Sequence, residues 1–459
     1  MKPSWKHIHF VGIGGTGLSA IARVLAERGF KVTGSDRQAS PRTAMLQSLG
    51  VAVAIGHAPE WAQQADVVVR SSAVPESDVD VVAAKEAGVP VFKRRDFLPY
   101  LTAGYRVLAV AGSHGKTTTT AMLAWVWTAL GQDPTFIIGS EAANLHTNAH
   151  AGQGADFIIE ADEYDYMFLG LTPYAAVVTN IEHDHPDLFP TAEDFYAAFQ
   201  AFASQVREDG FLLACADNKG SRNLAQARAQ ASATVWTYGL HSEADYQAQL
   251  MGVNAQGGHD FVMRFRGQAL AEVGLQVPGE HNVQNALAVL AVAHQMGLDV
   301  PAAAQALGAF QGTGRRFEVV GEAQEVAFVD DYAHHPTEIR ATLAAARQRY
   351  PGRRVWAVWQ PHTFSRTRTL LADFATAFAQ ADEVIVTEVY AAREAAPDDF
   401  GGQQAAMALQ HPRVHFAPSL QEAAEILIRE VRSPAVVLVF SAGDAPQVTR
   451  WALEGWQAK

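Results

Sequence analysis

The sequence has little cysteine and no long apolar run, and both scarcities narrow the class of protein. Cys215 is the only cysteine among 459 residues, so no intrachain disulfide can form and a reducing compartment is expected. No run of about 18 apolar residues is available to cross a bilayer. The first residues, MKPSWKHIHFVGIGG, lack the apolar centre of a secretory signal peptide. We therefore expect a cytoplasmic protein without a membrane partner.

Positive charge is also in short supply. The chain has 35 Lys and Arg residues against 48 Asp and Glu residues, which gives a net charge of -13. This balance argues against a nucleic-acid partner, although the phosphates of a small nucleotide need only a few local donors. Hydrophobic residues make up 49% of the chain, enough to bury a large core, and the length suggests two to four domains of about 100–200 residues.

Short apolar runs alternate with helical stretches rich in Ala and Leu. Most of the runs end in Gly, Asp or Ser, which is the βαβ pattern of α/β proteins with parallel sheets. The runs group into three sections, residues 1–103, 104–314 and 315–459. Within the second section, residues 232–277 alternate apolar and polar side chains, which favours a small antiparallel sheet.

A first glycine loop lies near the N-terminus. Gly12, Gly14 and Gly17 form a G-x-G-x-x-G pattern between the strand HIHFV and the helix LSAIARVLAERG, and Asp36 ends the next strand. This is the dinucleotide fingerprint, in which a diphosphate lies at the N-terminus of the helix. Taken alone the loop favours NAD over glycines that only shape a turn. It predicts a bound diphosphate without specifying which nucleotide carries it.

A second glycine loop, GSHGKT, lies within AVAGSHGKTTTT, but it is shorter than a standard P-loop. The standard pattern would place a glycine at Val110, whereas this loop begins at Gly112. Its position between the strand RVLAVA and a helix lets backbone N–H groups and the helix dipole hold ATP phosphates. Lys116 would reach the β and γ oxygens, and Thr117 would supply a hydroxyl to Mg²⁺. We interpret it as a nucleotide loop rather than a plain turn.

Acidic residues follow two strands soon after this loop. DFIIEADEYD contains Glu160 and Glu163, and AAVVTNIEHDHPD contains His185. Mg²⁺ takes oxygen ligands, which in α/β proteins come from the carboxyl ends of neighbouring strands. Thr117 with Glu160 and His185 therefore predicts metal sites in preference to a solvated acidic loop. Zinc is less favoured because no cysteine is near, and the choice between Glu160 and Glu163 as metal ligand stays open.

The stretch HNVQN precedes an apolar helix. Its Asn282 and Asn285 are three residues apart and so share one helical face, where both side chains can meet a ligand. Asparagine is also a frequent helix cap, which is an equally strong reading of Asn282.

Polar residues again end the strands of the third section. GTGRRF places Arg316 beside a glycine-rich segment, where a guanidinium can meet a phosphate through two hydrogen bonds. DDYAHHPTE brings Tyr332 and His334 to a strand end, before Pro336, which is suited to the first position of a helix. His334 either orients a substrate or caps that helix. QPHTFSRT adds Arg366 at another strand end.

Taken in order, these motifs resemble the Mur ligase family along essentially the whole chain. Its shortened phosphate loop is the GSHGKTTTT seen here, and the pairing of GTGRRF with DDYAHHPTE is specific. The resemblance implies an N-terminal Rossmann-like domain that holds UDP instead of NAD (residues 1–103). It further implies a central P-loop ATPase domain with a mostly parallel sheet (104–314) and a C-terminal Rossmann-like domain (315–459).

The family resemblance also implies an activity. It implies an ATP- and Mg²⁺-dependent ligase that joins L-alanine to the lactyl carboxylate of UDP-N-acetylmuramate through an acyl phosphate, in peptidoglycan precursor synthesis. A monomer or weak dimer is expected. Two alternatives stay open: a sister ligase that adds a preformed peptide to the same sugar nucleotide, and an NAD-binding oxidoreductase with an incidental GKT.

The resemblance assigns roles to individual residues. The residues expected in catalysis are Lys116, His185, Arg316 and His334. Those expected to bind ATP are Gly112, Ser113, His114, Gly115, Lys116, Thr117, Thr118, Asn282, Asn285, Arg316 and Tyr332. Those expected to bind substrate are Gly14, Gly15, Thr16, Gly17, Asp36, Ser72, His334 and Arg366, with the choice between Arg366 and Arg368 open. The expected metal ligands are Thr117, Glu160 and His185.

Overall fold

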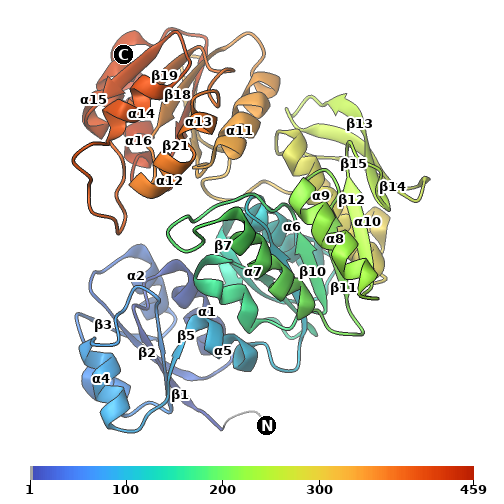
Figure 1. Cartoon of the computed structure of the whole chain (residues 1–459), viewed down its shortest axis with the longest axis vertical. Helices are drawn as coiled ribbons and strands as arrows, with labels where there is room; N and C mark the ends of the chain where they lie inside the picture. The colour runs from blue at the N-terminus through green and yellow to red at the C-terminus, as the bar shows by residue number, and fades with distance from the viewer. Residues whose placement is uncertain (1–3, 459) are drawn as a thin grey trace.

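The computed structural model describes residues 4–458, which form three α/β units in chain order, each built on one β-sheet (Figure 1). We call them the N-terminal, central and C-terminal units. The three-part α/β fold class expected from the sequence is confirmed. The domain limits at residues 103 and 314 stay predictions.

The N-terminal unit has a five-stranded parallel sheet in the order β3-β2-β1-β4-β5, with helices between successive strands. This order is that of a Rossmann-like fold, in which ligands bind outside the carboxyl ends of the strands. Its elements are β1 (His7–Val11), α1 (Thr16–Glu27), β2 (Lys31–Asp36), α2 (Pro41–Ser48), β3 (Ala52–Ile55), α3 (Pro59–Gln63), β4 (Val67–Arg70), α4 (Val79–Glu86), β5 (Val91–Lys93) and α5 (Arg94–Leu101).

The central unit has a ten-stranded, mostly parallel sheet in the order β15-β14-β13-β12-β11-β10-β6-β9-β7-β8. Its elements are β6 (Arg106–Ala111), α6 (Lys116–Ala129), β7 (Thr135–Ala142), β8 (Thr147–His150), β9 (Asp156–Glu160), the 3-10 helix η1 (Tyr164–Gly170), β10 (Ala175–Val178), α7 (Ala192–Ser204), β11 (Phe211–Cys215), α8 (Lys219–Gln230), β12 (Val235–Gly239), β13 (Tyr246–Val253), β14 (His259–Phe265), β15 (Gln268–Gly274), α9 (Glu280–Gln295) and α10 (Val300–Gly308).

The antiparallel strands expected within residues 232–277 are present, but they belong to the central sheet and do not form a sheet of their own. β13, β14 and β15 pair antiparallel with one another. β12 pairs in parallel with both β11 and β13, so the hairpins extend the edge of the central sheet. The alternating pattern specifies which face of a strand is buried, not which neighbour the strand joins.

The C-terminal unit has a six-stranded sheet in the order β16-β17-β21-β18-β19-β20, in which only β16 runs antiparallel. Its elements are β16 (Glu318–Ala323), β17 (Val326–Asp331), α11 (Pro336–Arg349), β18 (Arg354–Trp359), α12 (Phe364–Thr369), α13 (Leu371–Phe374), β19 (Glu383–Thr387), α14 (Gly402–Ala408), β20 (Val414–Ala417), α15 (Leu420–Glu430), β21 (Ala435–Phe440) and α16 (Pro446–Gln457).

The apolar cores show how the units are joined. One buried cluster includes Phe10 and Leu98 of the N-terminal unit together with Val107 and Phe157 of the central unit, so these two units share a core. The C-terminal unit has clusters of its own. It meets the central unit through polar side chains around the carboxyl ends of β6, β10 and β17, described below. Within residues 4–458, no helix combines the length and the apolar character needed to cross a membrane.

Candidate active site

The phosphate loop joins β6 to α6, and two glycines with positive φ give it its shape. Gly112 has φ +139, and a Cβ there would lie 2.0 Å from Thr179 Oγ1. Gly115 is the N-cap of α6 with φ +80, and a Cβ there would lie 2.8 Å from Asn285 Oδ1. Only glycine tolerates both the backbone conformation and the close approach. The loop thus leads into a helix N-terminus, where backbone N–H groups favour an anion.

Lys116 points into a ring of acceptors. Its Nζ lies 2.9 Å from Glu163 Oε2 and donates hydrogen bonds to the carbonyl oxygens of Gly112 and Ser113. Burial lowers the pKa of Lys116, but the nearby carboxylates, Glu163 foremost, outweigh burial and raise the pKa above its usual value. The ammonium is therefore charged and held beside the phosphate loop, where it can meet phosphate oxygens.

Thr117 and Glu160 form a pair of oxygen donors next to the loop. Thr117 Oγ1 donates to Glu160 Oε1 at 3.0 Å, and the backbone N–H of Gly139 donates to Glu160 Oε2 at 2.8 Å. Burial raises the pKa of Glu160 because it disfavours the ionised carboxylate. The positive charge of Lys116 opposes this effect only in part. Mg²⁺ prefers oxygen ligands such as a hydroxyl and a carboxylate, and both lie here beside the phosphate loop.

His185 lies apart from that pair. Its Nε2 is 3.6 Å from Glu163 Oε1 and 3.7 Å from Asp184 Oδ2. Burial lowers the pKa of His185, but Asp184 and Glu163 outweigh burial and raise it. Among the described residues, Glu160 and His185 belong to no common group of three ligand atoms within 4.8 Å. The structure thus brings Thr117 to Glu160, and His185 to Glu163, as two neighbouring clusters joined by Lys116.

A cleft of about 270 Å³ opens beside the phosphate loop, between the central and C-terminal units. Six of the residues predicted to bind ATP line it: His114, Gly115, Thr118, Asn282, Asn285 and Arg316. Asn282 donates to Pro278 O at 2.7 Å, and Asn285 donates to Asn282 Oδ1 at 3.1 Å. The capping alternative for Asn282 is wrong, because the N-cap of α9 is Gly279.

The C-terminal unit contributes Arg316, Tyr332 and His334 to the rim of this region. The Arg316 guanidinium lies 5.1 Å from the centre of the Tyr332 ring. His334 Nδ1 lies 2.9 Å from Tyr332 O, so Nδ1 is the donor and Nε2 carries a lone pair. Burial and Arg366 lower the pKa of His334 to about 3, which keeps the ring neutral. The capping alternative for His334 is wrong, because His335 is the N-cap of α11.

Of the two candidate arginines, Arg366 in QPHTFSRT and Arg368 just after it, Arg366 is the one in the site. Its Nε donates to Asp184 Oδ1 at 2.7 Å, and its Nη2 lies 3.3 Å from His185 Nδ1. Arg368 is 46% exposed and pairs with Asp399 at the surface. Arg366 therefore connects the C-terminal unit to the loop after β10.

The first glycine loop lies at the carboxyl end of β1. Its Gly14 N–H donates to Asp36 Oδ2 at 2.8 Å, so the predicted acid contacts the predicted loop. Gly15 is the N-cap of α1, which places Thr16 and Gly17 in its first turn. Ser72 lies on the neighbouring connection, after β4, and donates to the carboxylate of Asp165 in the central unit. The substrate residues predicted in the N-terminal unit thus lie at the carboxyl ends of β1, β2 and β4, and Ser72 among them contacts η1.

The sequence motifs assigned no individual role to several acids of the site. Glu182 and Glu338 line the cleft, and Asp184 is the partner of Arg366. All three stand inside motifs that the sequence analysis singled out, TNIEHDH and DDYAHHPTE. Glu338 lies three residues after the N-cap of α11, where a glutamate often has a fixed position at the start of a helix. That spacing is visible in the sequence and could have pointed to Glu338.

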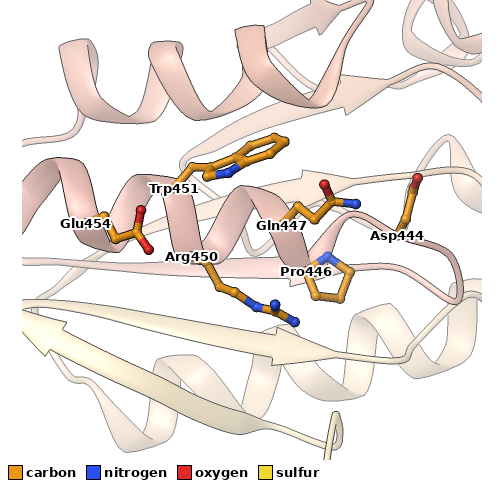
Figure 2. A pocket seen from close by; sticks show the side chains of 6 residues that line it. All are labelled: Asp444, Pro446, Gln447, Arg450, Trp451 and Glu454. Atoms are coloured by element: carbon orange, nitrogen blue, oxygen red, sulfur yellow. The ribbon is translucent and has the colours of Figure 1, made fainter. Parts of the chain in front are cut away.

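A second depression, on the C-terminal unit, is not a comparable site. Figure 2 shows that its lining comes from α16 and the turn before it, with Arg450 and Trp451 pointing to opposite sides of the helix. It contains none of the residues predicted for catalysis or binding, and its polar groups do not converge on one point.

The fold and the cleft together define a three-unit α/β enzyme that uses a nucleotide bound at a phosphate loop. Three family models match the chain in order: Mur ligase family, catalytic domain over residues 7–106, Mur ligase middle domain over 110–293, and Mur ligase, glutamate ligase domain over 315–443. The chain belongs to the Mur ligase family.

Relatives and solved structures agree with this placement. The chain is 44% identical to the UDP-N-acetylmuramate--L-alanine ligase of Frankia casuarinae over 93% of this chain and 91% of that protein. It is 40% identical to the protein of the same name from Solidesulfovibrio magneticus, with 99% of each chain covered. The crystal structure of UDP-N-acetylmuramate-alanine ligase from Thermotoga maritima superposes with a TM-score of 0.81 at 30% identity, covering 98% of this chain and 99% of that one.

Proposed function

We propose that the protein is an ATP-dependent ligase that joins L-alanine to the lactyl carboxylate of UDP-N-acetylmuramate, giving UDP-N-acetylmuramoyl-L-alanine, ADP and phosphate. The observation that carries the proposal is the meeting of two units at one site. Lys116 of the central unit and Arg366 of the C-terminal unit both contact the acids around His185. Nearly full-length similarity to ligases of that name supports the choice of substrates.

The first chemical step is attack of the lactyl carboxylate on the γ-phosphorus of ATP, which forms an acyl phosphate and releases ADP. Two anions approach each other in this step, so neutralising charge is the main task of the site. Lys116, beside the phosphate loop, and Arg316, across the cleft, are the cations placed for it. Asn282, Asn285 and Tyr332 border the same region and would contact the nucleotide.

The Mg²⁺ ion expected in this reaction suits the oxygen donors present. Thr117 and Glu160 would hold it, and His185 would serve a second position beside Glu163. When bound, the ion would neutralise phosphate oxygens next to the loop.

The second step is attack of the alanine amine, as free base, on the acyl carbonyl, with phosphate as the leaving group. The lone pair of His334 Nε2 can accept an N–H from this amine and orient it. A pKa of about 3 makes the imidazole a weak base, so we assign His334 to orientation rather than to proton removal. The guanidinium of Arg366 would meet the amino-acid carboxylate.

The N-terminal unit would hold the UDP part of the substrate. Its loop from Gly14 to Gly17 leads into the N-terminus of α1, a position suited to a diphosphate. Asp36 fixes that loop through Gly14 N–H, and Ser72 lies on the side that faces the central unit.

The proposal is tested by phosphate release from ATP and Mg²⁺ with UDP-N-acetylmuramate and a panel of amines: L-alanine, glycine, L-serine and the tripeptide L-Ala-γ-D-Glu-meso-diaminopimelate. We expect turnover that needs both the sugar nucleotide and L-alanine. Turnover with the tripeptide alone would assign the sister activity instead. No turnover with any amine, together with NAD(H) binding, would overturn the proposal in favour of the oxidoreductase alternative.

A further inference from the structure

His114, in the middle of the phosphate loop, lies between two carboxylates from different units. Its Nε2 is 3.4 Å from Glu182 Oε2, in the loop after β10 of the central unit. Its Nδ1 is 3.4 Å from Glu338 Oε1, in the first turn of α11 of the C-terminal unit. The side chains of His114 and Glu338 are each only 10% exposed. A buried contact therefore joins the phosphate loop directly to the C-terminal unit.

The surroundings favour a charged imidazole. Carboxylate oxygens face both ring nitrogens, and such oxygens can only accept hydrogen bonds. Burial lowers the pKa of His114, but Glu338 and Glu182 outweigh burial and raise it to about 9. The neighbouring His335 ring, 4.5 Å away, stays neutral because burial and His114 lower its pKa to about 4. His114 Nε2 makes no hydrogen bond of good geometry within the described residues, and Glu182 Oε2 at 3.4 Å is its ion-pair partner.

Glu338 has further partners on its own unit. Its Oε1 lies 3.3 Å from Arg316 Nη1, and its Oε2 accepts from the backbone N–H of His334 at 3.1 Å. Burial raises the pKa of Glu338, but the charges of His114 and Arg316 hold it well below its usual value. One ionised carboxylate thus contacts the phosphate loop, the arginine of the cleft and the segment that carries His334.

Neighbouring contacts cross the same boundary. Thr337, next to Glu338, donates through Oγ1 to Glu182 Oε2 at 2.8 Å. The Arg366–Asp184 pair crosses between the units on the other side of His334, with both side chains at most 5% exposed. The first turn of α11 is therefore held on the loop after β10, which keeps Glu338 over the phosphate loop.

We propose that Glu338 is a positioning residue for the nucleotide reaction. When the C-terminal unit docks, the Glu338 carboxylate fixes the His114 ring in the phosphate loop and fixes Arg316 across the cleft. One carboxylate thereby holds together the phosphate loop and the arginine of the cleft, which belong to different units. This inference rests on the proposed function, because it assumes that ATP is bound at the phosphate loop.

The test is Glu338→Gln, which keeps the shape of the side chain and removes its charge. Glu322→Gln is the matched control, since Glu322 lies on β16 of the same unit, is 45% exposed and pairs with Arg353 away from the cleft. We expect Glu338→Gln to lower kcat/KM for ATP and the affinity for ADP by about 10- to 100-fold, as for loss of a contact to a charged group. Binding of the sugar nucleotide without ATP should not change. Values equal to those of the control would overturn the proposal.

A double-mutant cycle shows whether Glu338 acts through His114. His114→Gln alone should also weaken ADP binding, and adding it to Glu338→Gln should cause less than the sum of the two losses. Additive losses would overturn the role through His114. If Glu338→Gln fails to fold by circular dichroism, unchanged ADP affinity in His114→Gln contradicts the proposal. The ADP titrations need no turnover, so they read out Glu338 even if the wild-type protein ligates none of the amines.

Discussion

Lys116 is a largely buried cation at the phosphate loop, and its charge is matched by a buried carboxylate. It faces Glu163 at 2.9 Å and two carbonyl oxygens of its own loop. In the reaction the same ammonium would meet the transferred phosphoryl group, where a preorganised positive charge lowers the barrier.

We therefore predict that Lys116→Ala abolishes ligation, with a fall in kcat of about 1,000-fold or more. The fold should survive, with a lower Tm because the buried Glu163 loses its cation. Phosphate release and thermal unfolding of the purified variant measure both effects. Ligation near the wild-type rate would contradict the assignment of Lys116.

Glu160 offers a separate test at the residue scale. Glu160→Gln removes the charge next to Thr117 and should raise the Mg²⁺ concentration that gives half-maximal activity by about 10-fold or more. Direct Mn²⁺ binding in the presence of ADP, followed by electron paramagnetic resonance, should weaken in parallel. The exposed Glu208→Gln is the control. Equal Mn²⁺ affinity in the two variants would remove Glu160 from the metal site.

The sequence predicted best those residues whose environment is local. Lys116 and Thr117 follow a strand and open a helix, so the motif alone places them near phosphate. Glu338 and Asp184 were given no individual role because their partners, His114 and Arg366, lie in another unit. Such contacts depend on how the units dock, which no local pattern encodes. The choice of Arg366 over Arg368 likewise required the structure, since both lie in one short helix.

At the scale of elements, the phosphate loop depends on a backbone that only glycine allows. Gly112 and Gly131 lie at the two ends of the loop–α6 element and both have positive φ. A Cβ at Gly112 would meet Thr179 Oγ1 at 2.0 Å, whereas a Cβ at Gly131 would meet open space. The two positions thus separate backbone strain from steric damage to the site.

Gly112→Ala should abolish detectable ADP binding, because the loop must move to relieve the clash. Gly131→Ala should cost about 1–2 kcal/mol of stability through its backbone conformation alone and leave ADP affinity unchanged. Calorimetric titration with ADP and thermal unfolding distinguish the two. Normal ADP affinity in Gly112→Ala would show that the loop does not need its observed shape.

Element prediction failed where pairing partners mattered. The strands within residues 232–277 were expected as a small antiparallel sheet, and they are antiparallel, but β12 connects them to the central sheet. No strand was predicted just after GTGRR, where the structure has β16. The first residues of β16, Glu318, Val319 and Val320, are exposed at a sheet edge and show no buried face.

At the scale of the whole molecule, the N-terminal and central units share an apolar core, whereas the C-terminal unit meets the central one through ionisable groups. Docking of the C-terminal unit should therefore respond to pH. The His114 pKa is raised from 6.5 to about 9, so its contribution is complete below pH 6.5 and is lost as the pH rises to about 9. The Glu182 pKa is lowered to about 2, so its contribution is complete above about pH 4.5 and is lost as the pH falls toward 2.

We predict that the C-terminal unit opens more at pH 9 than at pH 6.5. Small-angle scattering of the nucleotide-free protein should give a larger radius of gyration at the higher pH. His114→Gln should remove most of this difference, because it removes the group that titrates in that range. Identical scattering of the wild-type protein at both pH values would contradict the role of the interface.

The central claim, ligation through an acyl phosphate, is tested most directly by oxygen transfer. UDP-N-acetylmuramate labelled with ¹⁸O in the lactyl carboxylate is turned over with ATP, Mg²⁺ and L-alanine, and the released phosphate is analysed by mass spectrometry. Because the carboxylate oxygen that attacks phosphorus leaves with the phosphate, we predict one ¹⁸O per phosphate, only when L-alanine is present. Unlabelled phosphate, or phosphate release that does not need L-alanine, would contradict the account.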